Sequence, residues 1–180
     1  MKRFCVVLFA VLALSLAVFA QAPPSLPGYQ VSLAAGYSLL SGAQNNNGFF
    51  SSVAVPLRTW DKEWSFNLAG RGDYFSIVTP STYVITAGPE FRFQFSRASF
   101  FNGKVFQPFA NVGAGAARSS AGSGATYSAW KLGAGLDMPQ NSTLSWRLFE
   151  VDYIHSKIFP NNYTVLSNWA EVETGLKLSF

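Results

Sequence analysis

Apolar and polar side chains alternate with a period of two along most of the chain after residue 27. The alternation is clearest over residues 83–95, where Ile85, Ala87 and Phe91 alternate with Thr86 and Glu90. A period of two is typical of a β-strand with one apolar and one polar face. The pattern predicts eight strands, over residues 28–40, 50–58, 64–74, 83–95, 105–117, 130–138, 144–155 and 168–180.

One segment, residues 144–155, does not keep its parity. Arg147 stands at an odd position, whereas Glu150 and Asp152 stand at even positions, so strict alternation would turn one of these sets toward the apolar side. A β-bulge near Leu148 and Phe149 would return all three charges to one face. The alternative is that Arg147 lies near the strand end and extends toward polar headgroups.

The N-terminus predicts a cleaved signal peptide. Lys2 and Arg3 precede an apolar run over residues 5–20, which ends with Val18 and Ala20 at the spacing that a signal peptidase reads. The run has about 16 residues, fewer than the roughly 20 that a membrane-spanning helix needs. We therefore expect a signal peptide over residues 1–20, a short linker over 21–27 and one barrel domain over 28–180. Cys5 lies inside the apolar run, so the mature chain would contain no cysteine and no disulfide or Cys-ligated zinc.

Composition decides which face of the barrel meets solvent. Period two alone fits both a soluble barrel with an apolar interior and a membrane barrel with an apolar exterior. Only 12% of residues are charged while 49% are hydrophobic, and soluble domains normally have roughly a quarter charged. Aromatic side chains also gather at strand ends, as in the interfacial girdles of membrane barrels. The predicted interfacial aromatics are Trp60, Trp64, Tyr83, Phe95, Tyr153 and Trp169.

Nucleic-acid binding is not supported by the charge. The net charge is +4, but removal of Lys2 and Arg3 leaves eleven Lys and Arg against nine Asp and Glu, a net charge of +2. No cluster of Lys and Arg remains that would neutralise a row of phosphates.

Two stretches give the chain a resemblance to small bacterial outer-membrane β-barrel proteins of the OmpA/OmpX-like type. Residues 172–180 are apolar at most alternate positions and end in Phe180. Residues 108–115 begin with Pro and an aromatic residue and end in Gly-x-Gly, a pattern similar to a strand that is common in that group. The resemblance implies an all-β, eight-stranded antiparallel up-and-down transmembrane barrel, exported through the periplasm to the Gram-negative outer membrane. It also implies a C-terminal insertion signal at Thr174, Leu176, Leu178 and Phe180. The implied partners are outer-membrane lipid including lipopolysaccharide, and the barrel-assembly machinery during insertion.

The polar strand faces predict a charged barrel interior. An eight-stranded barrel is just wide enough for its inward side chains to fill it, and buried charges need partners. We expect a luminal charge network that closes the barrel. The alternative is a narrow, weakly cation-preferring channel, for which Gly113, Gly115, Gly133 and Gly135 would leave room. The expected network comprises Arg71, Asp73, Glu90, Arg92, Lys131, Asp137, Arg147, Glu150, Asp152, Glu171, Glu173 and Lys177.

The single histidine raises one catalytic hypothesis. His155 and Ser156, with Glu171 or Glu173 further on, superficially resemble the lipid A deacylases, whose His, Ser and Glu form a triad that faces lipid. Adjacent residues on a strand point to opposite faces, and both glutamates share the expected luminal face. We therefore predict no catalysis, no cofactor and no metal, and a structural or surface-interaction role. A lipid A-modifying acyl hydrolase is the second alternative, after the channel.

Overall fold

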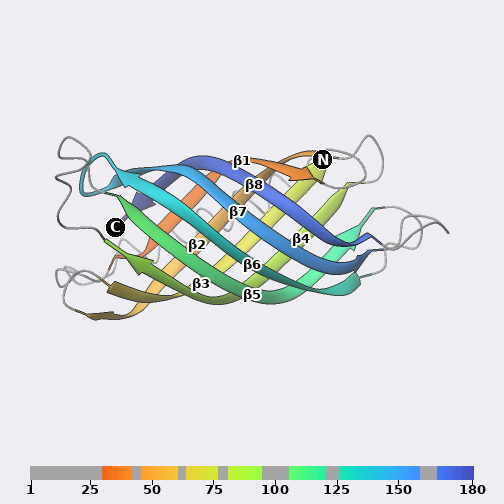
Figure 1. Cartoon of the computed structure of the whole chain (residues 1–180), viewed down its shortest axis with the longest axis horizontal. Coiled ribbons are helices and arrows are strands. Elements are labelled where there is room, and N and C mark those ends of the chain that lie inside the picture. Colours follow the sequence, from red (N-terminus) through yellow and green to blue (C-terminus); the bar gives the residue numbers. More distant parts are fainter. Residues whose placement is uncertain are drawn as a thin grey trace.

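The chain forms a closed barrel of eight antiparallel strands, each paired with its neighbour in sequence, with β8 paired to β1 (Figure 1). The computed structural model describes residues 30–41, 46–60, 64–76, 81–94, 106–120, 126–158 and 166–180. The predicted signal peptide and linker lie outside these residues and stay predictions. The strands are β1 (Ser32–Ser41), β2 (Asn46–Trp60), β3 (Trp64–Ser76), β4 (Thr82–Phe93), β5 (Gln107–Ser119), β6 (Thr126–Pro139), β7 (Leu144–Ile158) and β8 (Leu166–Ser179).

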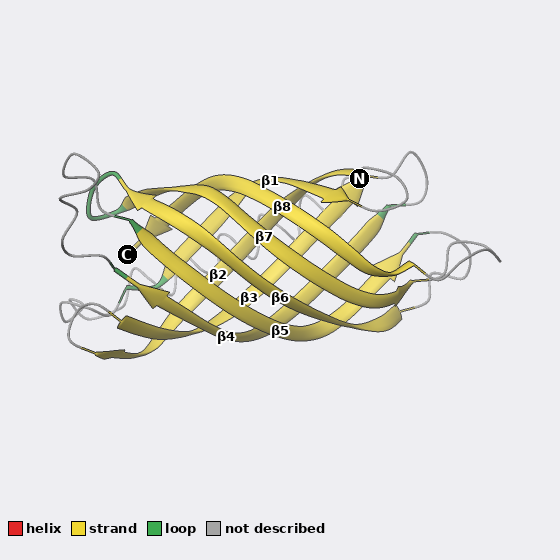
Figure 2. Ribbon diagram, in the orientation of Figure 1, coloured by secondary structure: helices red, strands yellow, loops and turns green. Residues whose placement is uncertain are grey.

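The all-β fold and its eight strands are thus confirmed, and most strands are longer than the alternation predicts. β2 begins at Asn46 and β6 at Thr126, four residues before the expected starts, because polar residues at the rim still pair in register. The described residues are strands and short connections (Figure 2). No helix long and apolar enough to cross a membrane occurs among them.

The apolar strand faces lie on the outside of the barrel. Ile85 and Phe49 are each 66% exposed and Leu132 is 54% exposed, whereas Glu150 and Glu171 are fully buried. An apolar exterior around a charged interior suits hydrocarbon outside and is the reverse of a soluble barrel. The structure therefore confirms the expected orientation of the two faces and excludes the soluble barrel.

The predicted β-bulge in β7 is present. The pairing of β7 with β8 shifts register between Arg147 and Glu150, and Leu148 and Phe149 both face outward. Arg147 is 1% exposed, so it points into the barrel and does not extend toward headgroups. Another register shift, between Pro56 and Arg58 of β2, was not predicted. Pro56 was the available signal, because proline has no N–H to donate to the neighbouring strand.

An apolar layer closes the interior at the barrel end that carries the β1–β2, β3–β4, β5–β6 and β7–β8 connections. Its members lie where these strands end or begin, next to the charged side chains along the inner face. The apolar layer consists of Leu40, Phe75, Val84, Ala117, Ala129, Ile154 and Trp169.

Trp169 is a correction to the predicted interfacial girdle. It is 8% exposed and belongs to the apolar layer, because it shares its inward parity with Glu171 and Glu173. Trp60, Trp64 and Tyr153 do lie on the exterior, 39%, 50% and 40% exposed. The half-buried Tyr83 contacts the ring of Tyr74 on the neighbouring strand. Phe95 lies outside the described residues.

Candidate functional site

The charged side chains of the barrel interior form two layers stacked below the apolar layer. Every one of the twelve residues expected in the luminal network takes part, and none of their side chains is more than 10% exposed. The layer next to the apolar residues, here called the acidic layer, contains Asp73, Asp152, Glu171 and Glu173 with Arg71 and Lys131. The layer beyond it, here called the balanced layer, contains Glu90, Asp137 and Glu150 with Arg92, Arg147 and Lys177.

Lys131 is the centre of the acidic layer. Its Nζ lies 2.6 Å from Glu171 Oε2, 3.0 Å from Asp73 Oδ2, 3.2 Å from Asp152 Oδ2 and 3.4 Å from Glu173 Oε1. These carboxylates come from β3, β7 and β8, while Lys131 comes from β6. One ammonium group therefore ties together strands on opposite sides of the interior.

Arg71 of β3 is the second cation of the acidic layer and connects it to the balanced layer. Its Nε donates to Asp73 Oδ1 at 3.1 Å, and its Nη1 donates to Glu150 Oε1 at 2.5 Å. Its Nη2 forms ion pairs with Asp152 and Glu173. A planar guanidinium suits this task, since its donors point in fixed, diverging directions.

In the balanced layer the cations and carboxylates are equal in number. Arg92 donates from Nε to Glu90 at 2.6 Å and from Nη1 to Asp137 at 2.5 Å. Arg147 donates from Nε to Asp137 at 3.1 Å and from Nη1 to Glu150 at 2.7 Å. Lys177 Nζ also lies 3.1 Å from Asp137. Each charge is therefore compensated within hydrogen-bond distance, which is the condition for burying it.

Neutral side chains complete the balanced layer. Asn67 donates to Glu90 Oε1 at 2.9 Å, and Asn111 donates to Glu150 Oε1 at 2.6 Å. The ring of Phe109 lies under the Arg147 guanidinium, with 4.5 Å from Cζ to the ring centroid. This role of Phe109 was not predicted, although its odd position in residues 105–117 sets it on the face of Asn111 and Gly113.

The ring of Phe50 likewise packs against Arg guanidinium groups, near the acidic layer. It is 2% exposed and lies 5.1 Å from Arg71 Cζ and 5.5 Å from Arg147 Cζ, measured from its ring centroid. Its even position, against the odd positions of the outward Val53 and Val55, was the available signal for an inward side chain.

The interior glycines accommodate neighbouring side chains. A Cβ on Gly133 would collide with the Asp152 carboxylate, and one on Gly135 would lie 2.5 Å from Phe109 Cζ. The space expected at these glycines for a channel is therefore filled by protein atoms.

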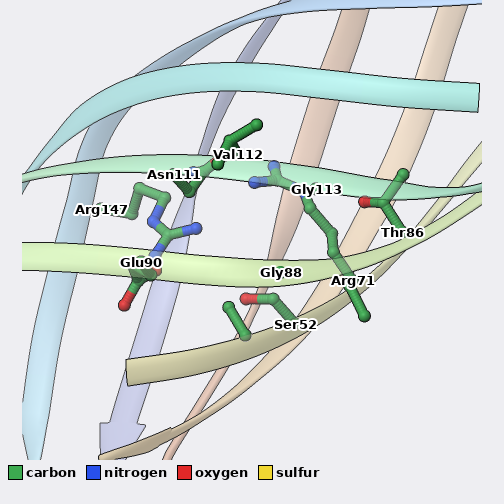
Figure 3. Close-up of a pocket in the computed structure, with 11 residues that line it drawn as sticks. Ser52, Arg71, Thr86, Gly88, Glu90, Asn111, Val112, Gly113 and Arg147 are labelled. Atoms are coloured by element: carbon green, nitrogen blue, oxygen red, sulfur yellow. The ribbon is translucent and has the colours of Figure 1, made fainter. Parts of the chain in front are cut away.

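A small cavity remains between the side chains of Arg71 and Arg147 (Figure 3). Its volume is about 20 Å³, enough for one water molecule, which needs roughly 10–15 Å³. Its polar lining consists of Ser52, Arg71, Thr86, Glu90, Asn111 and Arg147.

Two carboxylate triads lie close enough together to resemble metal sites. The oxygens of Asp73, Glu171 and Glu173 lie within 4.8 Å of one another, as do those of Glu150, Asp152 and Glu173. Lys131 contacts all members of the first triad, and Arg71 contacts all members of the second. Each triad is thus already in contact with one of the protein's own cations.

The residues of the hydrolase hypothesis are separated by the barrel wall. His155 stacks on Trp130 with ring centroids 5.3 Å apart, and its Nδ1 lies 2.8 Å from Asn168 Oδ1. Ser156 is 1% exposed on the interior side and donates to the Ser128 carbonyl at 3.1 Å. Glu171 and Glu173 also face inward, so these residues form no triad on either face.

The outer face of β8 carries the predicted insertion signal. Thr174, Leu176, Leu178 and Phe180 are all exposed, and the Thr174 hydroxyl donates to the Arg147 carbonyl at 3.0 Å. A hydrogen bond from the outward Thr174 to the backbone of the inward Arg147 thus joins β8 to the bulge of β7.

Comparisons with known proteins agree with this architecture. No protein-family model matches the sequence, and a search of curated proteins gives no match. Neisserial surface protein A (NspA) is similar in structure with a TM-score of 0.52 and 14% identity, covering 87% of this chain and 100% of that one. Ail of Yersinia pestis matches with a TM-score of 0.43 and 17% identity, covering 84% of this chain and 97% of that one. The outer-membrane enzyme PagL matches with a TM-score of 0.42 and 15% identity, covering 84% of this chain and 98% of that one. With its closed barrel of eight antiparallel strands and its likeness to NspA, the chain has the fold of the small bacterial outer-membrane β-barrels.

Proposed function

We propose that this protein is an integral outer-membrane barrel with a closed interior, which neither conducts ions nor catalyses a reaction. It would act in the structure of the envelope or through contacts at the cell surface. The observation that carries this proposal is the filled interior, in which an apolar layer covers two layers of ion-paired side chains.

The apolar layer supports a barrier to ions. An ion leaving water for this part of the interior would meet Phe75, Val84 and Ile154, which are fully buried, without polar partners to replace its hydration shell. In the acidic layer below it, carboxylates surround Lys131 and Arg71 at ion-pair distance, so charged side chains occupy this part of the interior. These features favour the closed barrel over the cation-preferring channel.

The wall between His155 and Ser156 supports the absence of hydrolase activity. A Ser nucleophile needs a base within hydrogen-bond reach, and these side chains point to opposite faces of β7. Tyr153 also donates to Asn168 Oδ1 at 2.6 Å, which places His155 in an exterior group of aromatic and polar side chains. This group fits an interfacial position at the membrane surface.

The proposed partners follow from the two exposed parts of the barrel. The apolar exterior and its aromatic side chains would contact outer-membrane lipid, including lipopolysaccharide. The outward face of Thr174, Leu176, Leu178 and Phe180 would be read by the barrel-assembly machinery during insertion. NspA is named a surface protein, and a surface role for this chain, through the connections at the end closed by the apolar layer, is our extension of that name.

Single-channel recording tests the proposal. Protein without the predicted signal peptide, residues 21–180, is refolded and its folding verified by heat-modifiability on a gel. It is then added to a planar bilayer in which a porin serves as the positive control. We expect folded protein without current. Steady cation-selective openings would refute the closed interior and make the luminal acids the residues to mutate.

A further inference from the structure

The acidic layer carries more negative charge than its own cations compensate. Four carboxylates, from Asp73, Asp152, Glu171 and Glu173, surround two cations, Arg71 and Lys131, so that two negative charges are in excess among the described residues. The balanced layer has three carboxylates for three cations and therefore cannot offset this excess. Uncompensated charge at zero exposure is strongly unfavourable.

Several carboxylate oxygens of the acidic layer lack a hydrogen-bond donor. Both oxygens of Asp152, Oε1 of Glu171 and Oε2 of Glu173 are buried without a hydrogen-bond partner, as are Nη2 of Arg71 and the Ser38 hydroxyl. Asp152 Oδ2 nevertheless lies within ion-pair distance of Lys131 and Arg71. Ser38 is fully buried and lies on β1 directly opposite Glu173 of β8, so it borders the same layer. An ionised carboxylate only accepts hydrogen bonds, so an extra proton on Asp152 or Glu171 would turn one of these acceptors into a donor.

Strand register places these acids against each other. Asp152 of β7 is directly opposite Glu171 of β8, and Glu150 is directly opposite Glu173. Like charges at directly opposite positions repel each other. A proton on one carboxyl group of such a pair removes this repulsion.

A bound metal ion is the less suitable source of positive charge. Lys131 and Arg71 already lie in contact with all members of the two compact triads, as described above. A metal ion would have to displace one of these cations, whereas a proton needs no additional space.

From these observations we propose that the acidic layer is a proton-binding site, in which one of the two carboxyl groups of Asp152 and Glu171 is protonated in the folded barrel at neutral pH. The proposal rests on the closed interior proposed above, but its test measures proton uptake rather than current, so the two can fail separately. The charged or titratable groups around this pair are Arg71 and Asp73 of β3, Lys131 of β6, Glu150 of β7 and Glu173 of β8.

The proposal determines the sign of the pH dependence. In the unfolded chain both carboxyl groups are ionised above about pH 5, so the folded state would hold one proton more. Stability then falls as pH rises. The folding equilibrium constant decreases by up to about tenfold for each pH unit over which the folded state keeps this proton and the unfolded chain does not.

The first test is reversible urea unfolding in lipid vesicles from about pH 6 to about pH 9, for wild type, Glu171→Gln and Asp152→Asn. Each amide variant removes a charge, keeps the side-chain shape and supplies the missing donor. We expect both to flatten the pH dependence and to be more stable than wild type at the alkaline end. Glu90→Gln, in the balanced layer, is the matched control, and it should lose stability while keeping the wild-type slope.

A second measurement does not depend on the variants' folding. The infrared spectrum of folded wild-type protein at neutral pH should contain the carbonyl stretch of a buried protonated carboxyl group, which ionises on alkaline titration. Absence of this band, or wild-type slopes in both amide variants, would overturn the proposal. Stabilisation of wild type by added Ca²⁺ that Glu171→Gln abolishes would also overturn it, in favour of a metal ion.

Discussion

A charge placed at Leu132 tests which face of the barrel meets lipid. Leu132 is the seventh of the fourteen residues of β6 and is 54% exposed on the outer face. An Arg at the bilayer midplane of such a barrel costs about 2–4 kcal/mol of stability, and the cost falls to about 0–1 kcal/mol near the interfaces. We therefore expect Leu132→Arg to lower the free energy of unfolding by about 2–4 kcal/mol.

The same strand supplies a depth control. Thr126 is exposed at the start of β6, six residues before Leu132, so both side chains share the outward parity. Six residues span roughly 20 Å along a strand, or about 15 Å along the membrane normal at a tilt of about 40°. This is more than half of an apolar belt about 25 Å tall, so Thr126→Arg should lie at the interface and cost about 0–1 kcal/mol.

Urea unfolding in phospholipid vesicles, followed by tryptophan fluorescence and by gel mobility, measures both variants. Leu132→Ala separates the loss of apolar surface from the introduction of charge. We expect Leu132→Arg to lose clearly more unfolding free energy than Thr126→Arg. Equal stabilities, or a negligible loss in Leu132→Arg, would show that this face of β6 does not meet hydrocarbon.

Three further substitutions test the interior by the same unfolding assay and by heat-modifiability. Glu90→Gln leaves Arg92 with a single carboxylate, and we expect a loss of about 3 kcal/mol, at the low end for breaking a buried pair; unchanged stability would contradict a tight ionic network. Lys131→Met removes the centre of the acidic layer, and a loss of about 3–5 kcal/mol or a failure to fold is expected. Gly36→Ala would place a Cβ 2.7 Å from Phe50 Cε1 and against backbone of β8, so β1–β8 closure should weaken by about 1–3 kcal/mol. A wild-type unfolding curve for either of the last two would show that the interior tolerates the change.

Parity along the sequence was sufficient to predict the strands, their faces and the bulge in β7. The reason is physical: moving a residue by one position turns its side chain from the interior to lipid, and for a charge this is costly. Arg147, Glu150 and Asp152 could therefore share the interior only through an extra residue between them. The three charges thus predicted the bulge as one of two alternatives, and the burial of Arg147 decides in its favour.

Parity was insufficient where an inward residue is apolar. Val84 and Ile154 stand at inward positions of β4 and β7, and Trp169 does so at the start of β8. Apolar side chains of the strands were predicted to face lipid, and Trp169 was predicted to belong to the interfacial girdle. Near the end of the barrel the interior is closed by apolar packing, so hydrophobicity there does not distinguish inside from outside.

The ion pairing itself could not be predicted from sequence. Arg71 and Glu150 are 79 residues apart and Arg92 and Asp137 are 45 apart. Which cation meets which carboxylate depends on the stagger of the strands when the barrel closes. The alternation shows that these side chains share an interior but not the height at which each lies.

This cross-barrel pairing gives the charged layers a role that stability alone does not explain, since well-packed apolar side chains often stabilise an interior as well as buried ion pairs do. Backbone hydrogen bonds between adjacent strands would form almost equally well after a slip of one residue, but such a slip would turn Arg71 or Lys131 toward hydrocarbon. Arg71 of β3 contacts carboxylates of β7 and β8, and Lys131 of β6 contacts those of β3, β7 and β8. Strands that do not neighbour each other are therefore held in one register, and the pairing of β8 with β1 closes the barrel at the height where these contacts are made.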